Sequence, residues 1–133
     1  MIETERLRNA TIKNFEDLDV WQKGRDLVIK IYELTGNFPK EELFGIASQL
    51  KRASLSIPAN IAEGFGRFHF MDKAKFYLNA RGSLYELRSH LLIAQELCLV
   101  KSEALDSIFK MVSDLSVKLN NLINKTRQLK EEH

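Results

Sequence analysis

Side chains suited to catalysis or metal binding are few in this 133-residue sequence. Its histidines are His69, His90 and His133, and its one cysteine is Cys98. A di-iron site in a helical bundle needs a Glu-x-x-His motif on two helices, and no histidine here follows a glutamate by three residues. Glu86 precedes His90 by four residues, which favours a pair on one helix face over a metal site, because the other ligands are missing. The sequence therefore predicts no metal site and no cofactor.

The arrangements that activate a nucleophile or hold a nucleotide phosphate are also missing. Cys98 has no cluster of cations beside it and falls on the apolar stripe of a predicted helix, where a free cysteine acts as a small apolar residue. Residues 64–67, Gly-Phe-Gly-Arg, look like part of a phosphate-binding loop, yet the preceding strand and the Lys-Ser/Thr pair are absent. The end of a helix is the better interpretation. We therefore expect a protein that is not an enzyme.

A binding role has more support, from the distribution of charge. The net charge is only +2, but positions 48–81 hold six cations and two carboxylates, interleaved with His69 and with phenylalanines at positions 65, 68 and 70. Cations beside aromatic rings can hold phosphates and stack bases, as nucleic-acid-binding surfaces do. The predicted nucleic-acid contacts are Lys51, Arg52, Arg67, Lys73, Lys75 and Arg81.

An ordinary helical surface explains the same pattern, and the residues alone favour it. Arg52 and Arg81 would then pair with Glu63 and Glu86, while the phenylalanines would cover one end of the fold. Charged faces of this kind are common on helices that pack through an apolar stripe.

Four amphipathic helices must position these residues. Apolar residues recur at spacings of three and four over residues 20–35, 40–63, 72–99 and 103–129. Asp19, with Gln22 three residues later, is the expected N-cap of the first helix, and Gly36 is its expected left-handed C-cap. Because proline removes a backbone donor and clashes with the preceding turn, we expect a kink near Pro58 or two abutting helices there.

Short connections make consecutive helices antiparallel neighbours. The sequence thus predicts an all-α, up-down-up-down four-helix bundle over residues 15–130, preceded by a flexible arm over residues 1–14. The longest apolar run, residues 91–94, is far too short for a membrane span, and nothing near the first residue resembles an export signal. With a single thiol, the expected location is the cytoplasm.

The third helix carries more apolar surface than a single bundle core can bury. One stripe would face the core, and a second lies one residue further along the chain. The surplus predicts an exposed patch, and such patches mark interfaces, so we expect self-association. The first stripe is Tyr77, Ala80, Leu84, Leu87, Leu91, Ala94 and Cys98, and the second is Leu78, Tyr85, Leu92 and Leu99.

Three stretches of the sequence resemble one protein family. They cover residues 15–27 (Phe-Glu-Asp-Leu-Asp-Val-Trp-Gln-Lys-Gly-Arg-Asp-Leu), residues 50–67, which include Ser-Ile-Pro-Ala-Asn-Ile-Ala-Glu-Gly, and residues 80–94, which begin Ala-Arg-Gly-Ser-Leu-Tyr-Glu-Leu. The sequence resembles the bacterial four-helix-bundle proteins encoded in intervening sequences of 23S ribosomal RNA genes. That family is related in fold to the accessory variability protein of retroelements, which binds nucleic acid and a reverse transcriptase.

The resemblance implies a short antiparallel bundle that assembles as a homopentamer. It also implies that four charged motif residues, Arg52, Glu63, Arg81 and Glu86, form a polar network between helices that fixes their register. Departures from the family pattern include Gly24, where alanine is usual, and the basic residues Arg88 and His90. The motif positions carried over are Arg52, Ser56, Pro58, Asn60, Glu63 and Gly64, with Arg81, Gly82, Ser83 and Glu86 opposite them.

These observations lead to one expectation and one alternative. We expect a cytoplasmic homo-oligomer, a pentamer by resemblance, that binds RNA or another nucleic acid through a basic surface assembled across subunits. The alternative is a scaffold that binds a protein partner and no nucleic acid. The sequence predicts no membrane partner.

Overall fold

The computed structural model describes residues 12–132, with side chains described up to Leu129; positions 1–11 of the predicted N-terminal arm lie outside the described residues. The described part is helical, with no strand. Its elements are η1 (Phe15–Asp17), α2 (Asp19–Thr35), η2 (Lys40–Glu42), α3 (Ile46–Phe65), α4 (Phe70–Glu96) and α5 (Ser102–Glu132). The prediction of an all-α four-helix bundle is confirmed.

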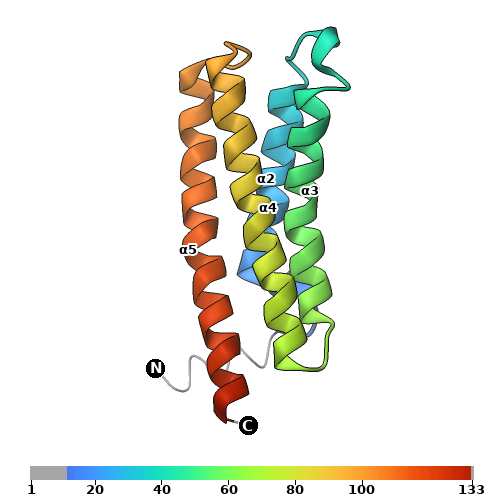
Figure 1. The fold of residues 1–133 in the computed structure, drawn as a ribbon, viewed down its shortest axis with the longest axis vertical. Coiled ribbons are helices and arrows are strands. Elements are labelled where there is room, and N and C mark those ends of the chain that lie inside the picture. Colours follow the sequence, from blue (N-terminus) through green and yellow to red (C-terminus); the bar gives the residue numbers. More distant parts are fainter. Residues whose placement is uncertain (1–11, 133) are drawn as a thin grey trace.

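The four long helices lie side by side and are connected at alternate ends of the bundle (Figure 1). Helix α4 packs against α3 and α5, and α2 packs against the same two helices, so that α2 and α4 stand diagonally. The connection between α3 and α4 is short, and it brings the start of α4 to the same end of the bundle as the final turns of α5 (Figure 1). This end of the bundle positions the site described below.

The core follows the predicted apolar stripes of all four helices. Helix α4 buries Tyr77, Leu84 and Leu91 at its centre line, as the first stripe predicts. In α5 the spacing of three and four predicts that Leu122 follows Leu119 in the core, but Leu122 is only half-buried and Ile123 is buried instead. A straight helix has 3.6 residues per turn, so an alternation of three and four loses register over eight turns.

The N-terminus of α2 is capped differently from the expectation. Leu18 is the N-cap residue and makes no side-chain hydrogen bond, while Asp19 is the first helical residue, so the predicted capping box is wrong. The Asp19 carboxylate lies 2.6 Å from Nζ of Lys118 on α5 instead, and Gln22 donates from Nε2 to the carbonyl oxygen of Glu16 at 2.9 Å. Contacts with other elements therefore occupy both side chains.

The left-handed residue that was expected at the C-terminal end of α2 is found at the C-terminal end of α4 instead. Gly36 was expected in a left-handed conformation, but its φ of −60° and ψ of −21° are right-handed. Cys98 instead has a φ of 58°. It ends α4 in a Schellman pattern, with the N–H of Leu99 donating to Ala94 and the N–H of Cys98 to Gln95, both at 3.0 Å. Cys98 is therefore exposed in a turn, and its assignment to the core stripe is wrong.

Helix α3 starts later and continues further than the second predicted segment. Residues 40–42 form the short η2, and the α-helix begins only after Gly45. The spacing of three before Ile46 predicts Leu43 in the core, but Leu43 is exposed. The helix then continues without interruption through Pro58, which excludes two abutting helices. The kink near Pro58 stays a prediction.

Candidate nucleic-acid interface

Small polar residues of the motif form the hydrogen-bonded contact between α3 and α4. The hydroxyls of Ser56 and Ser83 lie 2.8 Å apart, and Asn60 donates from Nδ2 to the carbonyl oxygen of Ser56 at 2.8 Å and to its hydroxyl at 3.0 Å. The three side chains are half-buried, where an unpaired polar group would be costly. These motif residues thus hold the two helices in register.

The charged motif residues do not form the network that the resemblance implies. Arg81 donates from Nη1 to Oδ1 of Asn120 on α5 at 3.0 Å, and Oε1 of Glu86 lies 3.5 Å from Nε2 of His90 on the same helix. Within residues 12–129, no ion pair joins Arg52 or Arg81 to Glu63 or Glu86. Position 81 lies about 200° around the helix from Ser83, so its side chain faces α5 rather than α3.

Gly64 and Pro58 of the motif, together with Gly24, lie where three helices come close together. A Cβ added to Gly64 would lie 2.6 Å from Cε1 of Tyr77 and 3.2 Å from the carbonyl oxygen of Lys73, so only glycine fits there without movement. A Cβ added to Gly24 of α2 would lie at an ordinary contact distance, 3.6 Å, from Ile57 and Pro58. The packing between α3 and α4 at Gly64 is therefore tighter than the packing between α2 and α3.

Lys73, one of the predicted nucleic-acid contacts, caps the end of α3. Its Nζ donates to the carbonyl oxygens of Phe65 at 2.6 Å and Gly64 at 3.3 Å, and lies 5.5 Å from the centre of the Phe65 ring. Both carbonyls belong to the last turn of α3, where no helical N–H follows four residues later, although that of Gly64 also accepts from the N–H of Arg67 at 3.2 Å. Burial lowers the pKa of the Lys73 ammonium below its ordinary value. Its hydrogen bonds give Lys73 a structural role, whatever else it contacts.

Lys51 and Arg52 lie far from the other predicted contacts. They occupy the first two turns of α3, a helix about 30 Å long, whereas Arg67 follows its last residue. Lys51 is close to α2, with Nζ 5.2 Å from the centre of the Tyr32 ring. The six predicted cations therefore do not form one cluster. Arg67, Lys73 and Lys75 lie at the end of the bundle where α3 joins α4, and Arg81 lies further along α4 on its α5 side.

The turn between α3 and α4 exposes aromatic surface beside these cations. Phe68 is 89% exposed and lies edge to face with His69, with ring centres 5.1 Å apart. The guanidinium of Arg67 lies 4.6 Å from the centre of the Phe76 ring, which orients it while leaving its N–H donors available. We call Arg67, Phe68 and His69 the turn cluster. Phe65 and Phe70, by contrast, are half-buried.

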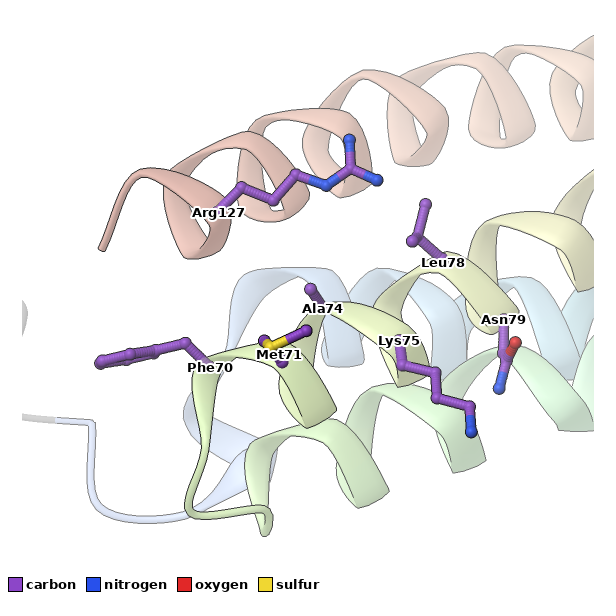
Figure 2. Close-up of a pocket in the computed structure, with 7 residues that line it drawn as sticks. All are labelled: Phe70, Met71, Ala74, Lys75, Leu78, Asn79 and Arg127. Atoms are coloured by element: carbon purple, nitrogen blue, oxygen red, sulfur yellow. The ribbon is translucent and has the colours of Figure 1, made fainter. Parts of the chain in front are cut away.

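A groove of about 330 Å³ lies next to the turn cluster, between the first turns of α4 and the last turns of α5 (Figure 2). The guanidinium of Arg127 reaches from α5 toward Leu78, while Lys75 and Asn79 extend side by side on the other side of α4 (Figure 2). Arg127 was absent from the predicted contacts. The alternating helix directions place it near position 75, and that signal was present in the sequence. The lining residues are Met71, Ala74, Lys75, Leu78, Asn79 and Arg127, with Phe70 at the open end.

The outer side of α4 carries the expected surplus of apolar surface. Two residues of the second stripe, Tyr85 and Leu92, are 50% and 45% exposed, and the neighbouring Ile93 is 49% exposed. A Cβ added to Gly82 would meet no heavy atom within 4 Å. We call Gly82, Tyr85, Leu92 and Ile93 the outer face of α4.

No three His, Cys, Asp or Glu side chains of the described region gather closely enough to hold a metal ion. His90 Nε2 is buried and forms no hydrogen bond within the described residues, although Oε1 of Glu86 lies 3.5 Å away. In the same part of the chain, no helix is both long enough and apolar enough to cross a membrane.

Comparison with known proteins identifies the family. The model of the 23S rRNA-intervening sequence protein family matches residues 16–121. The chain belongs to this family. The match covers the second and third stretches that carried the resemblance and all of the first except Phe15, and it confirms that prediction.

A solved structure supports the fold of this family member. The crystal structure of a protein with unknown function from the S23 ribosomal protein family of Bacteroides thetaiotaomicron is similar, with a TM-score of 0.73 and 21% sequence identity. The similarity covers 78% of this chain and 97% of the other. At this identity the likeness establishes the bundle fold alone. Comparison with curated proteins gave no match.

Proposed function

We propose that this protein is a non-enzymatic homo-oligomer that binds nucleic acid at the end of the bundle where α3 joins α4. The observation that carries the proposal is the turn cluster, where Phe68 is 89% exposed beside Arg67. An exposed aromatic ring next to a cation can stack a base and hold its phosphate. Lys75 and Arg127, neither of which forms an ion pair within the described residues, extend the basic surface from this turn to α5.

Self-association is the second part of the proposal, and the outer face of α4 supports it. Contiguous exposed apolar side chains on a folded protein usually belong to an interface. We propose a homopentamer, the assembly that the family resemblance implied. Repetition of a weak basic site in one assembly would raise its avidity for a long nucleic acid without any new contact.

The test is the affinity for RNA at several salt concentrations. The full chain is titrated into a fluorescein-labelled 12-nucleotide oligouridine, and anisotropy is followed between 20 and 200 mM salt. We expect binding that weakens steeply with salt, because displaced counterions account for much of the affinity. A double variant, Arg67→Glu with Phe68→Ala, should lose at least about tenfold in affinity.

Lys110→Glu is the matched control, because Lys110 is exposed on α5 and has no partner among the described residues. It changes the net charge by the same amount as Arg67→Glu but lies far along α5 from the turn cluster. Equal losses in both variants would mean that net charge alone attracts RNA. No binding at low salt, combined with capture of a protein partner that survives nuclease treatment, would replace the proposal by the scaffold function.

A further inference from the structure

The groove between α4 and α5 combines an apolar floor with cations on both sides. Met71, Ala74 and Leu78 form the floor, and Met71 is 62% exposed. Arg127 borders the groove from α5 and Lys75 borders it from α4, and the two side chains point in different directions (Figure 2). Neither cation forms a hydrogen bond or ion pair within the described residues, so both are available to a ligand.

We propose that this groove binds one unstacked nucleotide of a single-stranded nucleic acid. The base would lie on the side chains of Met71 and Leu78, and Arg127 and Lys75 would contact the phosphates on either side of it. This inference rests on the proposed function, since it assigns a ligand subsite next to the turn cluster.

The apolar floor is what distinguishes a single strand from a duplex. In a duplex the base faces are stacked on one another, so a duplex would offer this surface only its phosphates. A single strand can turn one base face onto the floor and still place its neighbouring phosphates near the two cations. The volume, about 330 Å³, lies at the lower end of the range for small-ligand sites and suits a single nucleotide better than a larger group.

The experiment compares single-stranded and duplex RNA on groove variants. The probes are a fluorescein-labelled 12-nucleotide RNA of mixed sequence that does not pair with itself, and the same strand paired with its complement. Arg127→Glu should weaken binding of the single strand about tenfold, whereas Lys110→Glu on the same helix should change it less than about twofold. Met71→Ser, which removes apolar floor without changing charge, should weaken the single strand several-fold and leave the duplex unaffected.

The outcomes separate this inference from the proposed function. If the unmodified chain binds neither probe, both fail. If it binds RNA but Arg127→Glu behaves like Lys110→Glu, or if Met71→Ser affects both probes equally, the groove assignment is overturned and RNA binding at the turn cluster stands. A labelled oligoglutamate peptide, which carries negative charge but no bases, serves as the last probe. Binding of this peptide as tight as that of the single strand would show that the groove recognises negative charge alone.

Discussion

Two glycines near the middle of the chain have opposite surroundings. Gly64, where α3 meets α4, has Tyr77 so close that a methyl group would overlap its ring, whereas Gly82 on the outer face of α4 has open space around it. An exposed glycine inside a helix costs about 1 kcal/mol relative to alanine without any packing benefit within the monomer. The inner side of α4 is thus filled by the bundle itself, whereas its outer face has room for the contact with another copy that we propose.

Replacing Gly64 by alanine tests the inner side and has the largest expected effect. A new Cβ would lie 2.6 Å from Cε1 of Tyr77, so the ring or the helix must move. We expect Gly64→Ala to lower the free energy of unfolding by about 3 kcal/mol, as overpacking of a well-packed contact does. Urea denaturation measures it. A loss below about 0.5 kcal/mol would mean that the contact between α3 and α4 at Tyr77 is looser than described.

The buried phenol of Tyr77 makes the inner side sensitive to alkali. Burial raises the pKa of Tyr77 from 10.0 to about 12. The folded state holds this proton more tightly than the unfolded state. The contribution of the protonated phenol to the free energy of unfolding is therefore intact below pH 10 and is lost as the pH rises toward 12. Near pH 11.5, the wild-type chain should have lost about 2 kcal/mol more stability, relative to neutral pH, than the Tyr77→Phe variant. Parallel profiles for the two proteins would contradict the burial of this hydroxyl.

Replacing Gly82 by alanine tests the outer face of α4. We expect opposite effects on the stability of the monomer and on its assembly. The monomer should gain about 1 kcal/mol of stability, because alanine favours the helix and meets no neighbour. If other copies pack closely against this face, the added methyl group should weaken assembly. Thermal unfolding in dilute solution and the concentration dependence of the mass measure the two effects. An unchanged assembly would place the interface elsewhere.

The smallest expected change in stability comes from a substitution at the C-terminal end of α4. Cys98 adopts a left-handed conformation, with a φ of 58°, that only glycine takes without strain. Cys98→Gly should therefore raise the free energy of unfolding by up to about 1 kcal/mol. Cys98→Ser, which keeps the side chain and its strain, is the control and should leave stability close to that of the wild type.

Local patterns in the sequence predicted most of the bundle. The stripe of Tyr77, Leu84 and Leu91 is buried as predicted, because the apolar period alone decides which face of a long helix is inside. Helix ends were less predictable. Asp19 suits an N-cap, but its carboxylate pairs with Lys118, a partner almost a hundred positions away in the sequence. Cys98 was assigned to the core because the stripe continues through it, while the helix stops two residues earlier, at Glu96.

The candidate site was only partly predictable for a related reason. Cations and aromatic residues close together in the sequence, such as Arg67 and Phe68, were found by their pattern. Which cations the fold already uses depends on contacts between elements, and composition cannot show that Lys73 caps α3 or that Arg81 binds Asn120. Arg127 was missed because it joins the site from another helix. As candidate nucleic-acid contacts, Lys75 and Arg127 are therefore favoured over Lys73 and Arg81.

The most direct test of the whole account is the mass of the purified protein by light scattering coupled to size exclusion, with absorbance at 260 and 280 nm recorded across the peak. We predict an assembly of five 15.4 kDa chains that carries nucleic acid at low salt and loses it at high salt. A monomer would contradict the role of the outer face of α4. An oligomer free of nucleic acid that also fails to bind added RNA would contradict the proposed function.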